Sequence, residues 1–188
     1  KTFKTLLLEQ FKKRLRTEDL PQTLEQLIAF EAKHGFESYA SGFGLLEDEQ
    51  ASLVGWSTDR AFATQITPFA QANGSGSFYA NWEKEVGMAV AQRPIIVFGD
   101  EGDLYVVAQN FDALLPLLAL DNEIYIDEDE ASFEEDDPMG SEHHAAFVQW
   151  YEQLLQQAPN PQPAATIAAA RDQHQADFEV WSQPFLPH

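Results

Sequence analysis

Few side chains in this sequence combine a reactive type with a spacing that chemistry could use. The 188 residues include no cysteine, which excludes disulfides and thiolate catalysis. His143 and His144 are neighbours, and because adjacent side chains on a helix point about 100° apart, both cannot easily bind one metal ion. His174 and Asp177 are spaced for one helix face, but His174 falls on an apolar stripe, which favours a packed histidine. No metal site is predicted from these groups.

Two short motifs resemble ligand-binding loops but lack essential residues. Asp127 and Asp129 begin like a calcium-binding EF-hand loop, yet Ser132 replaces its turn glycine and Pro138 replaces its bidentate glutamate. The run 73–76, Asn-Gly-Ser-Gly, could cradle a phosphate, but the residues after it predict a strand and not the N-terminus of a helix. There is also no nucleophile elbow and no Walker loop. We therefore expect no cofactor, no metal ion and no catalytic residue, as in a protein that is not an enzyme.

The chain is strongly acidic, and its charge is unevenly distributed. The formal net charge is −20 at pH 7. Seven of the eleven lysines and arginines fall within residues 1–33, against five carboxylates, so this segment carries about +2 and the remaining 155 residues about −22. Such a surface repels phosphate backbones, which argues against direct binding of nucleic acid. It attracts a basic protein and accelerates the encounter with it, so a basic protein partner is expected.

The strongest concentration of this charge lies in residues 121–137, which hold ten carboxylates and no lysine or arginine. These side chains cannot be buried without a large desolvation cost. The segment 127–140 is therefore expected to be a solvated mobile loop, a strip that binds a basic partner, or a segment that folds back on the basic N-terminal helix. The candidate partner-binding carboxylates are Asp127, Glu128, Asp129, Glu130, Glu134, Glu135, Asp136 and Asp137.

Aromatic residues between positions 36 and 65 allow two interpretations. Phe36, Tyr39, Phe43 and Trp56 could pack in the core, which is the favoured interpretation, or line a recognition groove. In the second case Tyr39, Phe43 and Trp56 would join the candidate partner-binding residues. Aromatic side chains serve both purposes because they bring a large apolar area to either place.

Hydrophobic spacing predicts helices at both ends of the chain. Apolar residues recur at every fourth position within 2–16, which predicts an amphipathic helix. A second helix is expected to begin at a cap from Asp19 and to end at Gly35. Towards the other end, Ser141 is expected to cap one helix, and a last helix is expected from about residue 166. These last two helices are predicted to pack on the sheet as a helical hairpin.

Two glycine turns organise the sheet that is predicted between these helices. Gly74 and Gly76 lie between apolar strand-forming residues, which is typical of a β-hairpin. Gly99 and Gly102 separate two runs that do not alternate apolar with polar residues. Strands that are apolar on both faces are covered on both faces. This second hairpin is therefore expected at the centre of the sheet, under helices.

Shorter elements are expected around this core. Residues 53–54 and 61–63 are strand candidates, and 124–126 could form a last strand. Asn110 is expected to cap a helix that Pro116 keeps short or kinked.

Composition and hydropathy set the class and the location of the protein. An apolar content of 44% excludes disorder of the whole chain. No apolar run approaches the ~20 residues that a membrane helix needs, and the first residues do not form a signal peptide. We therefore expect no membrane contact and a cytoplasmic location.

The central third of the chain resembles the SUKH superfamily, which includes the Smi/Knr-like proteins of yeast cell-wall regulation and many bacterial immunity proteins. The resemblance rests on the order of residues 68–70, 73–76, 95–102, 106–108, 110–111 and 114–115. It implies an α+β fold with a central, mostly antiparallel sheet and flanking helices. It also implies protein binding, because most bacterial members resemble antidotes that bind a toxin domain, often a nuclease.

The sequence therefore predicts one α+β domain over residues 1–188. Its expected parts are N-terminal helices in 1–35, a sheet core in about 36–126, an acidic loop in 127–140 and C-terminal helices in 141–188. The expected function is that of a non-catalytic immunity protein that neutralises a basic, nuclease-type toxin domain. The alternative is an adaptor or regulatory module that recruits a cellular partner.

Overall fold

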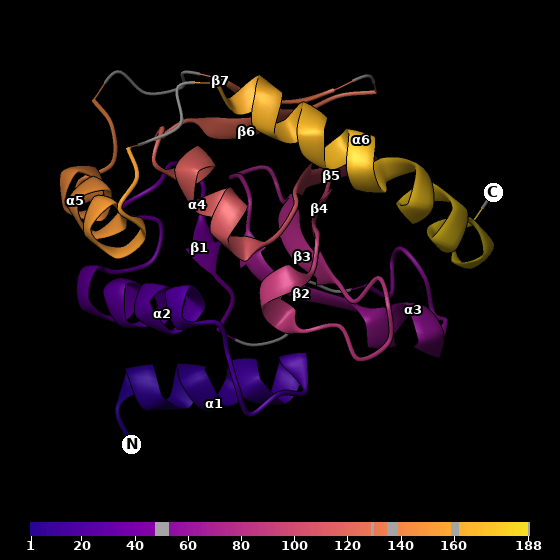
Figure 1. The fold of residues 1–188 in the computed structure, drawn as a ribbon, viewed down its shortest axis with the longest axis horizontal. Helices are drawn as coiled ribbons and strands as arrows, with labels where there is room; N and C mark the ends of the chain where they lie inside the picture. Colours follow the sequence, from indigo (N-terminus) through magenta and orange to yellow (C-terminus); the bar gives the residue numbers. More distant parts are fainter. Residues whose placement is uncertain (48–52, 129, 135–138, 159–161, 188) are drawn as a thin grey trace.

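The computed structural model describes residues 1–47, 53–128, 130–134, 139–158 and 162–187, and it has an α+β fold (Figure 1). Antiparallel strands form a main sheet in the order β1-β2-β3-β4-β5, and β6 and β7 form a separate two-stranded sheet. The strands are β1 (Gly44–Leu45), β2 (Ile66–Gln71), β3 (Phe78–Trp82), β4 (Ile95–Phe98), β5 (Leu104–Ala108), β6 (Glu123–Ile126) and β7 (Ala131–Glu134). The helices are α1 (Phe3–Leu15), α2 (Gln22–His34), α3 (Arg60–Gln65), α4 (Phe111–Leu118), α5 (His144–Leu155) and α6 (Pro163–Ser182), with 3-10 turns at Val90–Gln92 and Gln183–Phe185. The predicted fold class is confirmed.

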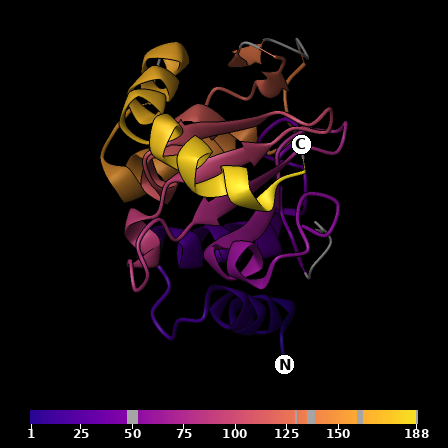
Figure 2. The same ribbon diagram turned by 90° about the vertical axis from the view of Figure 1, so that its right-hand side faces the viewer.

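The main sheet is buried on both faces, as its continuous apolar runs predicted. In β4, Ile95 and Val97 belong to one core, and Ile96 and Phe98 belong to a second core on the opposite face. The first core also contains residues of α1, α2, α4 and α5. The second core contains residues of α3 and α6, including Phe178, and Figure 2 shows α6 lying across the sheet.

The β4–β5 hairpin does not lie at the centre of the sheet, which corrects the prediction. The middle strand is β3, and β5 is the last strand in the order. The outer edge of β5 is covered by α6 and not by another strand. The side chain of Gln175 accepts a hydrogen bond from the Val106 N–H (2.8 Å) and donates one to the Leu104 carbonyl (3.2 Å). These bonds satisfy backbone groups that an additional strand would otherwise satisfy.

Both predicted glycine turns are confirmed. Gly76 and Gly102 have φ of 115° and 110°, a region that glycine enters without a steric penalty. In the first turn, the Asn73 side-chain oxygen accepts hydrogen bonds from the N–H groups of Ser75 (3.2 Å) and Ser77 (3.1 Å). Such a bond pattern is the usual reason for asparagine in tight turns.

Local cap signals were correct at some helix ends and wrong at others. The Asn110 side chain caps α4 by accepting from the Ala113 N–H (2.9 Å), and Gly35 follows the last residue of α2. Ser141 does not cap α5, because its hydroxyl donates to Asp121 (2.7 Å) and the helix begins at His144. Asp19 does not cap α2, whose N-cap position is Pro21 and has no side-chain hydrogen bond.

The two short strands predicted before β2 are also wrong. Residues 61–63 lie in α3, because the Asp59 carboxylate accepts from the Ala61 N–H (2.8 Å) and starts a helix there. Residues 53–54 lie in a turn in which the Leu53 carbonyl accepts from the Trp56 N–H (2.9 Å) and the Ser57 N–H (2.8 Å).

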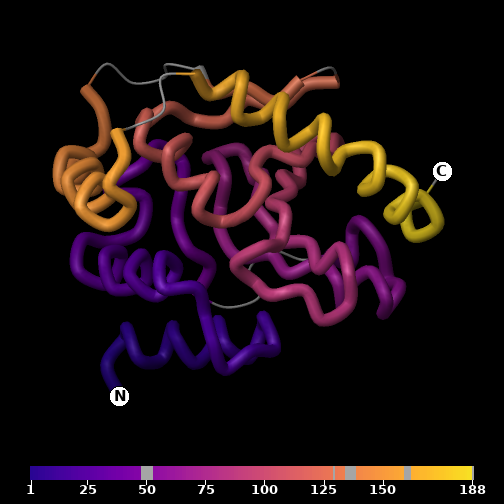
Figure 3. Tube along the Cα trace, viewed as in Figure 1, coloured from indigo at the N-terminus to yellow at the C-terminus, as the bar shows by residue number. Residues whose placement is uncertain are grey.

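The two C-terminal helices are present, but they do not pack as a hairpin. α5 buries Phe147 and Tyr151 in the first core, whereas α6 reaches that core only through Ile167 and packs Ala170 and Phe178 into the second core. The tube trace shows their separation within the described part of the chain (Figure 3). The predicted hairpin does not form because each helix has its own apolar face to bury, and the sheet offers two faces.

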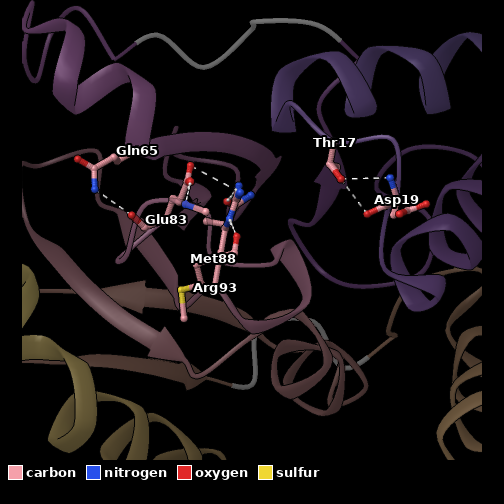
Figure 4. A network of polar contacts seen from close by, with 8 residues as sticks. Thr17, Asp19, Gln65, Glu83, Met88 and Arg93 are labelled. Atoms are coloured by element: carbon pink, nitrogen blue, oxygen red, sulfur yellow. Dashed lines mark hydrogen bonds and ion pairs between the residues drawn. The ribbon is translucent and has the colours of Figure 1, made fainter.

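A buried arginine organises the segment between β3 and β4 (Figure 4). The Arg93 guanidinium donates to the Met88 carbonyl (3.0 Å) and to the Asn81 side chain (3.2 Å), and it lies 3.6 Å from the Glu83 carboxylate. Gln65 donates to the Glu83 carbonyl (2.9 Å), which connects the same segment to α3. This network fixes the connection between β3 and β4. Its polar groups bond one another, which indicates a structural role.

The carboxyl group of Glu31 is buried at the end of the first core. Only 4% of the residue is exposed, and its Oε1 accepts from the Leu45 N–H (2.9 Å) and the Tyr39 hydroxyl (3.0 Å). Burial raises the pKa of Glu31 from 4.5 to about 7, against the lowering effect of the two hydrogen bonds. Glu31 thus connects α2 to β1 at the cost of a carboxyl group that resists ionisation.

This burial predicts a specific pH dependence of stability. The folded pKa of Glu31 lies above the unfolded value, so its contribution is complete below pH 4.5 and is lost as pH rises through about 7. Glu31→Gln keeps an acceptor oxygen and never ionises. Between pH 5 and pH 8, urea unfolding should show the stability of Glu31→Gln improving relative to wild type by about 2–3 kcal/mol. Glu18→Gln, at an exposed position, is the control, and parallel pH curves for Glu31→Gln and wild type would contradict the prediction.

Candidate functional site

The segment predicted as an acidic loop is in part a β-hairpin. β6 pairs with β7, with Ile124 opposite Phe133 and Ile126 opposite Ala131. Ile124 and Ala131 are buried in the first core, and Ile126 and Phe133 pack against it. The expectation of a mobile loop is therefore wrong for residues 130–134, because these apolar side chains hold the hairpin against the body of the protein.

The structure describes part of the predicted set of binding carboxylates. Glu128 and Glu130 are exposed, and Asp127 is half-buried, where its carboxylate accepts from the Glu130 N–H (2.9 Å). Glu134 is the last residue of β7. The remaining candidates, Asp129, Glu135, Asp136 and Asp137, lie outside the described residues.

The β6–β7 hairpin is hydrogen-bonded to the first glycine turn and to β5 of the main sheet. Glu123 Oε1 accepts from the Gly74 N–H (2.5 Å), and the Tyr105 hydroxyl donates to the Asp127 carbonyl (2.7 Å). Between the two turns, the Ser77 hydroxyl donates to Asp100 (2.9 Å). Carboxylates from two separate segments, 100–103 and 128–130, are thereby brought to one end of the molecule. We call this surface the acidic pole and define it by Asp100, Glu101, Asp103, Glu128 and Glu130.

The basic N-terminal helix lies far from the acidic pole. Figures 1 and 2 show α1 and the β6–β7 hairpin at opposite ends of the molecule. The expectation that the acidic segment folds back on this helix is wrong for the described residues, because Leu7, Phe11 and Leu15 pack α1 against the far side of the first core. The molecule is therefore electrically polarised, with Lys4, Lys12 and Lys13 on the α1 end.

A groove of about 640 Å³ adjoins the acidic pole. Its aromatic part consists of Phe78 and Phe98, whose rings are stacked with centroids 4.8 Å apart, and Trp56, which meets Phe98 edge-on at 5.1 Å. Asp100 and Glu101 also line it. The other lining residues are Gly55, Gly76, Gly99, Gly102, Leu186 and Pro187.

Of the four aromatic candidates, two lie in the core and one in this groove, whereas Phe36 is 41% exposed and belongs to neither. Tyr39 and Phe43 are fully buried, so the core-packing interpretation holds for them and they cannot contact a partner in this fold. Trp56 is half-buried and lines the groove. Phe78, Phe98 and Glu101 were recognised only as parts of strands or turns. Sequence signals could not place them in a groove, because residues 186–187 complete it from the far end of the chain.

His174 and His144 have structural roles. The Nδ1 atom of His174 lies 3.2 Å from the Lys84 ammonium, which also pairs with Asp177 (2.6 Å). Burial and the neighbouring Lys84 lower the pKa of His174, so the neutral ring accepts this hydrogen bond and fixes α6 near the end of β3. His144 donates through Nδ1 to the Tyr39 carbonyl (2.9 Å). Within the described ranges, no group of three or more histidines and carboxylates is arranged to hold a metal ion.

No helix in the described part of the chain is both long and apolar enough to cross a membrane. Comparison with models of protein families, with curated proteins and with solved structures found no match. The resemblance to the SUKH superfamily therefore stays a prediction from the sequence.

The contact of Tyr105 with the start of the acidic segment can be tested by removing one hydroxyl. Tyr105→Phe deletes the hydrogen bond to the Asp127 carbonyl, and a lost neutral hydrogen bond of this kind costs about 1 kcal/mol of stability. Amide exchange at Asp127 and Glu130, whose N–H groups bond within this segment, should accelerate about fivefold. Tyr125→Phe, at an exposed position of β6, is the control. Equal exchange rates in the two variants would show that Tyr105 does not anchor the acidic pole.

Proposed function

We propose that this protein is a non-catalytic binding domain that covers a cationic surface of a partner protein. The observation that supports the proposal is the charge separation between the acidic pole and α1. None of the five carboxylates that define the acidic pole forms an ion pair with a described residue. Their potential is therefore not neutralised within the described structure, and it favours a basic partner at this end of the molecule.

The partner that fits this surface best is a protein domain that itself binds nucleic acid. Such a domain presents lysine and arginine side chains to phosphates, and the carboxylates of the acidic pole would stand where these phosphates lie. Occupying that surface blocks access of nucleic acid by steric exclusion and by charge, without a chemical reaction. An immunity protein against a nuclease-type toxin acts in this way, and a toxin of that type attacks intracellular nucleic acid, which agrees with a cytoplasmic location.

A second candidate function is that of an adaptor that recruits a partner through apolar contact. The half-buried Trp56 in the groove favours it. Apolar binding of this kind would tolerate salt, whereas association that is driven by the acidic pole slows as salt rises.

The two functions can be separated with a variant of the acidic pole that leaves the groove intact. The partner is first captured from the source organism at low ionic strength and identified by mass spectrometry, and its association rate with the wild type is then measured. Asp103→Asn, Glu128→Gln and Glu130→Gln together should slow association about tenfold at 50 mM salt, and the rate with wild type should fall steeply towards 500 mM.

The matched control removes three exposed carboxylates elsewhere, at Glu85, Glu152 and Asp172, and it should keep the association rate within about twofold of wild type. If the captured partner is a nuclease, binding should also inhibit its activity. A partner that is not basic, or an association rate that neither salt nor the acidic-pole variant changes, would refute the proposal and favour the adaptor.

A further inference from the structure

We infer that the groove beside the acidic pole receives an arginine side chain of the partner protein. This inference rests on the proposed function and specifies its contact: the planar guanidinium would lie against the half-buried Trp56 and pair with the carboxylates at the margin of the groove. Three properties of the groove lead to this occupant: its aromatic lining, its uncompensated charge, and its glycine-lined margin.

The aromatic lining suits a flat cation. Phe78 and Phe98 are buried beneath the groove, and Phe98 supports the Trp56 ring edge-on at 89°, so Trp56 is the aromatic side chain that an occupant can reach. Trp56 is half-buried, so part of its side chain is available to an occupant. Guanidinium groups stack on aromatic faces, and tryptophan is the strongest aromatic partner for a cation.

The carboxylates of the groove have no cationic partner in the described structure. Glu101 makes no hydrogen bond and no ion pair with a described residue, and Asp100 uses Oδ1 for the hydroxyls of Ser75 (3.3 Å) and Ser77 (2.9 Å). Those serine contacts orient the Asp100 carboxylate, and they leave its Oδ2 available. Two charged acceptors beside an aromatic surface match the fork of donors that arginine presents.

The charge around the groove excludes several other occupants. Two adjoining hollows share Leu186 and Pro187 with it and bring Asp59 and Glu179 to the same region. No lysine, arginine or histidine is among the described residues that line these three hollows. A phosphate or nucleotide would be repelled there, and a neutral apolar ligand would desolvate Asp100 and Glu101 without pairing them.

The glycines at the margin let a peptide backbone approach the groove. At Gly55 and Gly102, which line the groove, there is open space where a Cβ would lie, so neither position obstructs a partner chain. At Gly55, an added Cβ would meet no atom within 4 Å, and the backbone is not in the left-handed region. A larger residue at Gly55 therefore fits without disturbing the fold, and because Gly55 lines the groove we expect Gly55→Leu to obstruct access to it.

The test uses short blocked peptides, acetyl-Gly-Arg-Gly-amide and the same peptide with citrulline, which is neutral and nearly the same shape as arginine. Each is titrated into the wild-type protein and followed by two-dimensional NMR of backbone amides and tryptophan indoles. The arginine peptide should shift the signals of Trp56, Gly99 and Gly102 and should bind at least about tenfold more tightly than the citrulline peptide. Equal binding of the two peptides, or shifts confined to other surfaces, would overturn the inference.

Three variants define the contacts. Gly55→Leu should abolish the shifts, and Glu101→Gln should weaken the arginine peptide about fivefold without affecting the citrulline peptide. Trp56→Leu should weaken it about tenfold. Asp172→Asn, at an exposed position of α6, is the control for Glu101→Gln and should bind as wild type does. Trp56 also packs on Phe98, so Trp56→Leu could destabilise the fold. If that variant does not fold, the Gly55→Leu and Glu101→Gln variants are sufficient to test the inference.

The outcomes distinguish this inference from the proposed function. If Gly55→Leu binds the arginine peptide as wild type does, the groove is not the site and the inference fails, while the association test with Asp103, Glu128 and Glu130 can still succeed. Signals of the groove that shift with protein concentration alone, in the absence of peptide, would identify a second copy of this chain as the occupant and would also overturn the inference.

Discussion

The burial of the main sheet on both faces is the constraint from which the rest of the structure follows. β3 and β4 send alternate side chains into two separate cores, so neither face of these strands is open to a ligand. Backbone hydrogen-bonding groups at both edges of the sheet also have side-chain partners. Gln175 of α6 bonds the backbone of β5, and the Arg14 guanidinium of α1 donates to the Leu46 carbonyl (2.6 Å) just after β1. Binding surfaces are consequently restricted to the turns and to the elements around them.

The same packing explains why the charge is polarised. Carboxylates cannot enter the two cores without a large desolvation cost, so they gather in turns and in the β6–β7 hairpin. The hairpin is held at one end by Ile124 and Phe133, and α1 is held at the other end by its own apolar stripe. The distance between the acidic and basic segments is thus a consequence of where apolar residues pack, and no direct interaction between the two segments is needed to produce it.

Features that depend on a few adjacent residues were predictable from the sequence. The glycine turns, the Asn110 cap and the end of α2 at Gly35 all follow from local backbone chemistry. Predictions failed where a side chain found a distant partner instead of a local one. Ser141 bonds Asp121 across twenty residues of sequence and so does not cap α5. The strand predicted at 124–126 is present as β6, but its partner β7 was not predicted, because the apolar residues Ala131 and Phe133 lie among many carboxylates.

The sequence by itself determined the fold class, the two glycine hairpins and the excess of negative charge, because periodicity, turn chemistry and composition are properties of neighbouring residues. Only the tertiary structure decided which carboxylates share a surface, that β5 ends the sheet, and that Trp56 meets Glu101 and Leu186 at one groove. These residues come from segments far apart in the chain, and they are brought together by the burial of apolar area on two faces of one sheet. The hydrophobic effect is non-directional and does not specify which distant segments pack together. The composition of the groove therefore cannot be derived from local sequence patterns alone.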